Sequence, residues 1–198
     1  MEIIYRQARK KDCKKLGLLT SIAGDGLLEY MLDGVVPGMS AVEVAAYDLA
    51  DNKGPKSYRN VIVAEAKNKV KGMAFSYHSR HHCIDQDLRD FIPWERLQPL
   101  QPLFSARVED SLYLDTLAVD EDLRGQGVGG KLIDLTKQKA RENEFNSLSL
   151  IVSAENEGAM SVYRKHGFKG VHEIPMDGLK TMPGNGALLL MECKLSAG

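Results

Sequence analysis

The sequence predicts an α/β protein, built as a mixed α+β sheet in a single domain of residues 1–198. Strand-like and helix-like patterns alternate along the chain, which is typical of a sheet covered by helices. The chain has 198 residues, a length that suits one sizeable core. Hydrophobic residues make up 43% and charged residues 27%, as in ordinary soluble folded domains.

The charge balance argues against nucleic-acid and membrane partners. The chain has 26 basic and 27 acidic side chains and a formal net charge of -1, so no global field attracts polyanions. No apolar run approaches the ~20 residues that span a bilayer, and residues 1–6 do not begin like a signal peptide. The cysteines Cys13, Cys83 and Cys193 are scattered and odd in number, which favours free thiols in a reducing compartment. We therefore expect a cytoplasmic protein.

The first part of the chain is predicted to form two helices and three strands. A strand is expected at 3–8, a helix from about 13 to 24, a short segment at 27–32 and a turn at 34–38. Ser40 is predicted to be the N-cap of the next helix, because Glu43 completes a capping box. A break at 52–55 and strands at 61–64 and 72–77 follow.

The segment 78–108 is the least regular, and so long a loop in a compact domain is often functional. Trp94 with its apolar neighbours is predicted to be either a lid over a bound molecule or a local packing cluster. Zinc was considered for one group of this segment: His78, His81, His82, Cys83 and Asp85. Adjacent histidines on a strand would point to opposite sides, and no second cluster has ligand spacing. We expect a polar loop without a metal.

The later part of the chain gives the clearest pattern. A strand is predicted at 112–119, followed by a glycine loop and a helix from about 128 to 143. A strand at 148–152, a helix at 156–166 that ends before Gly167, and two strands at 169–174 and 187–193 complete the chain. A glycine loop between a strand and a helix is a general device for holding phosphate, since the first N–H groups of the helix are free to bind an anion.

The glycine loop fits neither of two common phosphate-binding motifs well. A nucleoside-triphosphate loop would require Ser or Thr after Lys131, where Leu132 stands. Gly125, Gly127 and Gly130 do have the dinucleotide spacing. However, the loop lies late in the chain and lacks an acidic partner for the ribose, which disfavours a dinucleotide-binding oxidoreductase.

Two motifs of the later part resemble the GCN5-related N-acetyltransferase (GNAT) superfamily. Arg124-Gly125-Gln126-Gly127-Val128-Gly129 is similar to its pyrophosphate loop. A second motif with the pattern N-x-x-A-x-x-x-Y-x-x-x-G-F comprises Asn156, Ala159, Tyr163, Gly167 and Phe168. The resemblance is close over 112–170. It implies a mostly antiparallel twisted sheet that is split after its central strand to form an acyl-CoA cleft.

The resemblance also implies acetyl-CoA as co-substrate and assigns residues to it. The loop and helix start would hold the pyrophosphate, the central strand would pair with the pantetheine arm, and the second motif would contact the arm and the sulfur. The residues so assigned are Leu117, Ala118, Val119, Arg124, Gly125, Gln126, Gly127, Val128, Gly129, Gly130, Lys131, Asn156, Ala159 and Tyr163. Asn156 is equally consistent with a helix N-cap.

Two side chains are candidates for catalysis. An alkyl ammonium has a reference pKa of ~10.4 and must lose a proton before it attacks a thioester. Asp115 is predicted to share one strand face with Tyr113 and Leu117, where it could bind or deprotonate the amine. The alternatives are Glu109, Asp110 or a chain of water molecules as the base.

Each of the two candidates also has a purely structural interpretation. Asp115 could instead cap a turn or pair with Arg107. Tyr163 resembles the family's acid for the leaving thiolate, but it could equally be a packing residue. The resemblance also implies that the backbone N–H of Val119 faces the thioester oxygen, as oxyanion stabilisation requires.

These observations predict an N-acetyltransferase that moves acetyl directly from acetyl-CoA to a primary amine of a small molecule or peptide. The acceptor site would be formed by segments near 27–54 and 78–108. The alternative is a module that binds or senses acyl-CoA without turnover, and a homodimer is possible. The sequence does not name the acceptor or the acyl length.

Overall fold

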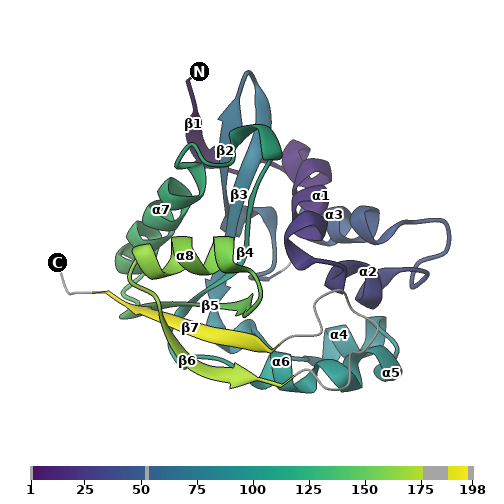
Figure 1. The fold of residues 1–198 in the computed structure, drawn as a ribbon. Helices are drawn as coiled ribbons and strands as arrows, with labels where there is room; N and C mark the ends of the chain where they lie inside the picture. Colours follow the sequence, from purple (N-terminus) through teal and green to yellow (C-terminus); the bar gives the residue numbers. More distant parts are fainter. Residues whose placement is uncertain (1, 52–53, 176–186, 196–198) are drawn as a thin grey trace.

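The computed structural model describes residues 2–51, 54–175 and 187–195, which form a seven-stranded sheet covered by helices (Figure 1). The order across the sheet is β1-β2-β3-β4-β5-β7-β6. The strands are β1 (Ile4–Gln7), β2 (Val61–Ala66), β3 (Lys69–His78), β4 (Leu112–Val119), β5 (Ser147–Ser153), β6 (Lys169–Ile174) and β7 (Leu188–Lys194).

The sheet is split in its middle, between β4 and β5. These two strands run parallel and pair only at Leu112 with Leu148 and at Tyr113 with Ser149. β4 then continues to Val119 without a β5 partner. All other strand pairs are antiparallel. The predicted mixed, mostly antiparallel sheet that splits after its central strand is therefore confirmed.

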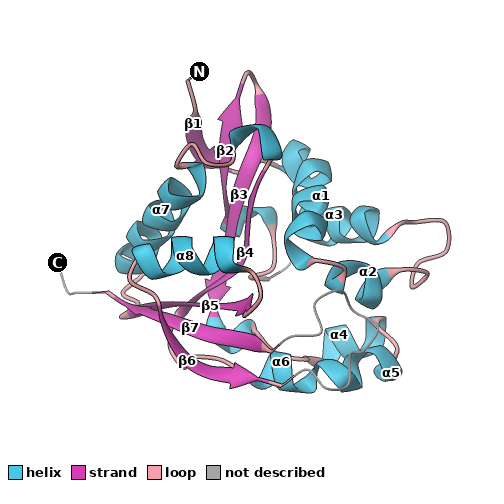
Figure 2. Ribbon diagram, viewed as in Figure 1, coloured by secondary structure: helices cyan, strands magenta, loops and turns pink. Residues whose placement is uncertain are grey.

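Helices cover both faces of the sheet (Figure 2). One face carries α1 (Cys13–Gly24) and α3 (Ala41–Asp51), with α2 (Leu27–Leu32) beside them. Gly17 is required where α1 meets α3, because a Cβ there would lie 2.5 Å from the Val42 carbonyl oxygen. The other face carries α7 (Val128–Glu142) and α8 (Glu157–Lys165), whose buried side chains share one core with β4 and β5.

The segment 78–108 is not the irregular loop that we predicted. It contains α4 (Gln86–Phe91), α5 (Trp94–Leu97) and α6 (Gln101–Ser105), with 3-10 turns at Ser79–His81 and Gln98–Leu100. A proline stands in the first turn of the 3-10 segment Gln98–Leu100 and another in the first turn of α6. At these positions the missing N–H of proline costs no helical hydrogen bond. Elements of three to six residues are too short to show a helical period, which explains the wrong prediction.

The predicted capping box at the start of α3 is confirmed. The Ser40 N–H donates to Glu43 Oε2 at 2.9 Å, and the Glu43 N–H donates to Ser40 Oγ at 3.3 Å, which is the capping box at the start of α3. Further 3-10 turns lie at Lys10–Asp12, Tyr58–Asn60 and Glu121–Leu123. Asn52 and Lys53, part of the predicted break after α3, lie outside the described residues. In the part of the chain that is described, no helix is long and apolar enough to cross a membrane.

Candidate active site

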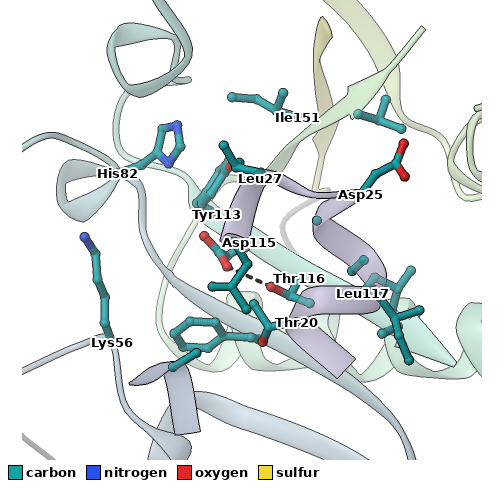
Figure 3. A pocket seen from close by; sticks show the side chains of 18 of the residues that line it. Thr20, Asp25, Leu27, Lys56, His82, Tyr113, Asp115, Thr116, Leu117 and Ile151 are labelled. Carbon is teal, nitrogen blue, oxygen red and sulfur yellow. Dashed lines mark hydrogen bonds between the residues drawn. The ribbon is translucent and has the colours of Figure 1, made fainter. Parts of the chain in front are cut away.

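A cavity of about 2220 Å³ opens where β4 and β5 part (Figure 3). One side is lined by the exposed end of β4, by β5, and by the starts of α7 and α8. The other side is lined by residues of α1, α2, α3 and the segment 81–104. Small-molecule sites usually measure ~300–1,000 Å³, so this cavity has room for two substrates.

The start of α7 has the features of an anion site. Gly127 caps the helix with φ +79°, Gly125 has φ +73°, and no atom lies within 4 Å of a Cβ built at either position. The first hydrogen bond of the helix runs from the Lys131 N–H to the Gly127 carbonyl at 3.0 Å. The preceding N–H groups therefore sit at the positive end of the helix and open space lies beside them.

Two side chains of the loop bind backbone rather than pointing freely to the cavity. Arg124 Nε donates to the Val119 carbonyl at 3.1 Å, and Gln126 donates to the Asp122 carbonyl at 2.8 Å. Of the residues predicted for the coenzyme, Gln126 and Lys131 do not line the cavity. Gly130 does line it, and a Cβ there would lie 2.8 Å from His166 Nε2, so a side chain at this position would displace the His166 ring.

A β-bulge at Asp115 changes the predicted face of β4. The pairing passes from Phe75–Thr116 to Ser76–Leu114 and leaves Asp115 without a partner on β3. The extra residue reverses the alternation of side chains. The prediction that Tyr113, Asp115 and Leu117 share a face is wrong: Leu117 packs with the α7 core, whereas Tyr113 packs with the α1 core.

Asp115 is an exposed carboxylate on the cavity wall that two hydroxyl groups hold in place. Tyr77 donates to Oδ1 at 2.6 Å, and Thr116 Oγ1 donates to Oδ2 at 2.8 Å. Burial, and next the charge of Asp115, hold the pKa of Tyr77 and of Tyr113 well above the usual range. Both phenols therefore stay protonated at neutral pH and face the carboxylate as neutral groups.

The other acidic residues considered for the base lie away from the cavity. The Glu109 side chain is 70% exposed and accepts from Arg107 Nε at 2.8 Å. The Asp110 side chain is 94% exposed. Neither lines the cavity. Arg107 therefore pairs with Glu109, and the predicted pair of Arg107 with Asp115 is wrong.

Tyr163 lies on α8 and lines the same cavity. Its side chain packs edge-on against Phe168, with the ring centres 5.7 Å apart, and the residue is 8% exposed. Burial raises the pKa of Tyr163 to about 12. The phenol is therefore both a packing residue and a protonated donor at the cavity wall.

Asn156 begins α8 in the way that the N-cap alternative predicts. Its Oδ1 accepts from the Ala159 N–H at 3.0 Å. Asn156 and Ala159 both line the cavity. The backbone N–H of Asn156 donates to the Ser153 carbonyl at 3.1 Å, and its carbonyl accepts from the Met160 N–H at 2.9 Å.

The acceptor side of the cavity is acidic, which sequence reasoning did not foresee apart from Asp115. Lys56 is the basic side chain of this side, and it lies 4.0 Å from Asp85. Apolar side chains of α2 and α4 form the rest of the wall. Trp94 does not line the cavity. The Arg89 guanidinium carbon lies over the Trp94 ring, 5.0 Å from the ring centre. The acidic residues of this side are Asp25, Asp48, Asp51, Asp85, Asp87 and Asp115.

His82, which the sequence placed only in the group weighed for zinc, also lines this side of the cavity. It is 3% exposed, and its Nε2 lies 3.0 Å from the Leu103 carbonyl oxygen. Its ring stacks on Phe104 and tilts over Tyr113, with centres 5.4 and 4.2 Å away. Across the described ranges, no three His, Cys, Asp or Glu side chains are grouped as metal ligands.

Comparisons with known proteins agree with this architecture. A mycothiol acetyltransferase from Jonesia denitrificans is 31% identical over 115 residues, which are 48% of this chain and 36% of that relative. The chain thus spans about a third of the length of this curated relative. An N-acetyltransferase structure from Staphylococcus aureus Mu50 has a TM-score of 0.71 at 20% identity, covering 96% of this chain and 99% of that one.

A third similar protein was solved with a ligand. It is a putative acetyltransferase from Salmonella typhimurium with its cofactor acetyl-CoA, with a TM-score of 0.63 at 16% identity, covering 99% of this chain and 95% of that one. At such identities the two structures show a shared fold. Fold and site together define an acyltransferase-like α/β protein with a split sheet. The model of the Acetyltransferase (GNAT) family matches residues 39–168, more than half of the chain, so the protein belongs to that family.

Proposed function

We propose that the protein transfers an acetyl group from acetyl-CoA directly to a primary amine of a small molecule or peptide. The observation that carries the proposal is one continuous cavity with an anion site at the start of α7, a protonated Tyr163 and the fixed carboxylate of Asp115. Family membership supports acetyl transfer in general. The amine acceptor is inferred from the acidic wall.

The coenzyme would lie along β4 and end at α7. Beyond Tyr113 the edge of β4 that faces β5 has no strand partner, so backbone groups of Leu117 and Val119, which point away from β3, are available to pair with the pantetheine amides. The pyrophosphate would lie against Gly125 and Gly127, where a Cβ meets open space. Coenzyme roles of Gln126 and Lys131, which lie outside the cavity lining, have the least support.

The acceptor would enter from the acidic side as an ammonium. Carboxylates of Asp25, Asp48 and Asp115 face this part of the cavity, and charge complementarity favours a cation there. After the amine loses a proton, its nitrogen attacks the thioester carbon, and Tyr163 protonates the departing sulfur. The attacking nitrogen loses a second proton and becomes the neutral nitrogen of the amide. Free coenzyme A leaves as a thiol.

The proposal is tested by incubating the protein with acetyl-CoA and a panel of cationic amines and basic peptides. Thiol release is followed spectroscopically, and each amine is examined for the mass increase of one acetyl group. Both signals should rise together and only with the protein present. Tight binding of acetyl-CoA without any acetylated amine would instead support the non-catalytic binding module.

A further inference from the structure

We propose that His82 accepts the proton of the acceptor ammonium through its Nδ1 atom, while Asp115 holds the cation beside it. This inference rests on the proposed acetyl transfer and assigns its base to a residue outside the family motifs. Three features of the structure support it: the tautomer of the ring, an unpartnered nitrogen, and the place of the ring in the cavity.

The tautomer follows from the partner of Nε2. A backbone carbonyl can only accept a hydrogen bond, so the contact of 3.0 Å to the Leu103 oxygen requires a hydrogen on Nε2. In the neutral ring the lone pair is then on Nδ1. Burial lowers the pKa of His82 below its ordinary value, although the Leu103 carbonyl and Asp115 oppose the shift. The ring is therefore neutral, and able to accept a proton, at physiological pH.

The Nδ1 atom has no hydrogen-bond partner among the described residues, although it is buried. A buried polar atom without a partner is unfavourable, and such atoms are uncommon in folded proteins. Leu103 on one side and the stacked rings on the other hold the imidazole in this costly position. A substrate ammonium that donates a proton to Nδ1 and leaves after turnover accounts for the arrangement.

The ring lies in the acceptor half of the cavity. In Figure 3 the Tyr113 side chain lies between those of His82 and Asp115, and all three line the cavity together with Lys56. His82, Phe104 and Tyr113 all line the cavity, and the rings of Phe104 and Tyr113 pack against the imidazole, so the proposed transfer includes a movement of these side chains that exposes Nδ1. An ammonium held by Asp115 would then meet a neutral base.

The charges around the ring are suited to this task. Asp115 favours the imidazolium that forms, and the Leu103 carbonyl keeps its hydrogen bond to it. Lys56 and Arg107 disfavour the imidazolium and help the ring to release its proton to solvent. The protons balance. The ammonium gives one proton to Nδ1, and the nitrogen loses a second proton as the amide forms. That second loss is matched by the one proton that the leaving sulfur gains.

The test compares pH profiles of kcat/KM for the wild-type protein, His82→Gln and His78→Gln. Glutamine can still donate to the Leu103 carbonyl but cannot accept a proton near neutral pH. His78 is a matched control, because it lies in the same segment and outside the cavity lining. For the wild-type protein, kcat/KM should fall as the pH drops below 6.5, the ordinary pKa of histidine. His78→Gln should show the same profile as the wild type.

His82→Gln should lose this acid limb and about 10²–10⁴-fold in rate, as is typical when a general base is removed, with coenzyme A affinity unchanged. An unchanged rate and acid limb in His82→Gln would overturn the proposal, and so would a wild-type profile without an acid limb. If His82→Gln does not fold, His82→Ala should regain activity with imidazole and not with the non-basic pyrazole. Absence of any acetylated amine with the wild-type protein would contradict the acetyl transfer itself.

Discussion

The Tyr77 hydroxyl donates a hydrogen bond of 2.6 Å to Oδ1 of Asp115, across the β3–β4 pair. The bond forms at the bulge where Asp115 has no backbone partner on β3, so the side chain leaves the ladder and reaches the cavity. Tyr77 is buried, and its fixed position therefore fixes the carboxylate. This geometry makes Asp115 a prepared binding group for a cation.

Replacing Asp115 with Asn should weaken the binding of the cationic acceptor amine. The variant keeps the shape and can accept one of the two hydroxyl hydrogen bonds on its amide oxygen, but it loses the charge. A hydrogen bond to a charged group contributes about 1.5–3 kcal/mol. We expect kcat/KM for a cationic amine to fall about 10- to 100-fold, while the Kd of coenzyme A stays constant. Glu109→Gln is the matched control and should equal the wild type. If Glu109→Gln shows the loss and Asp115→Asn does not, the acceptor site has been placed on the wrong carboxylate.

Replacing Gly127 with Val should weaken coenzyme A binding by at least about tenfold. The side chain would enter open space at the start of α7, where the pyrophosphate is proposed to lie. Valine at φ +79° also strains the backbone by about 1–2 kcal/mol. Gly38→Val separates the two effects, since Gly38 has φ +78°, equally open surroundings and no part in the cavity lining. Calorimetry should show lost affinity for the first variant only.

Replacing Tyr163 with Phe should lower turnover more than coenzyme affinity. The phenol has a pKa of about 12 and donates as a neutral acid. Removing an acid that acts in the transition state typically costs about 10²–10⁴-fold in rate. Tyr5→Phe, also a tyrosine packed against the α7 core, is the control. Steady-state kinetics that give the same kcat for Tyr163→Phe and the wild type would show that Tyr163 serves packing alone.

Lys139 predicts a pH dependence of stability that is separate from activity. Its ammonium lies between Asn60 and Ser76, and burial lowers the pKa of Lys139 to about 8 from its ordinary 10.5. Between these values the unfolded chain binds the proton and the folded chain does not, so the folded state gains stability as pH rises from about 8 to 10.5.

The measurement is the free energy of unfolding by urea at several pH values, for the wild type and for Lys139→Met. The difference between the two should shift in favour of the wild type as pH rises through this window. Lys14→Met, at an exposed position of α1, should show a difference that does not change with pH. A constant difference for Lys139→Met would mean that its ammonium stays charged in the folded protein.

The sequence predicted the parts of the fold that follow from local pattern. The long α7 and the succession of strands along the chain were clear, because a helical or alternating period repeats several times in each. The glycine start of α7 was clear from its composition. The capping box of Ser40 and Glu43 and the N-cap of Asn156 were also readable, because each depends on residues three positions apart. The short helices of 78–108 were missed, because one turn of helix leaves no period.

The site was predicted only where it is local in the sequence. The bulge at Asp115 follows from the pairing of β4 with β3, which the sequence of β4 alone does not reveal. Simple alternation along β4 therefore led to the wrong prediction that Leu117 and Asp115 share a face. The acidic wall gathers Asp25, Asp48 and Asp115 from three separate elements, which no spacing rule reveals. The sequence placed His82 in a candidate metal group but not as a base, because that role depends on the partner of one ring nitrogen and the lack of a partner for the other.

The measurement that tests the central claim most directly is a calorimetric titration of the wild-type protein with acetyl-CoA, coenzyme A and NADH in parallel. The account predicts saturable binding of both coenzyme A species and no heat from NADH, since the start of α7 lies in an acyl-CoA cleft. If neither coenzyme A species binds, the glycine loop serves another purpose, and the proposed acetyl transfer is contradicted.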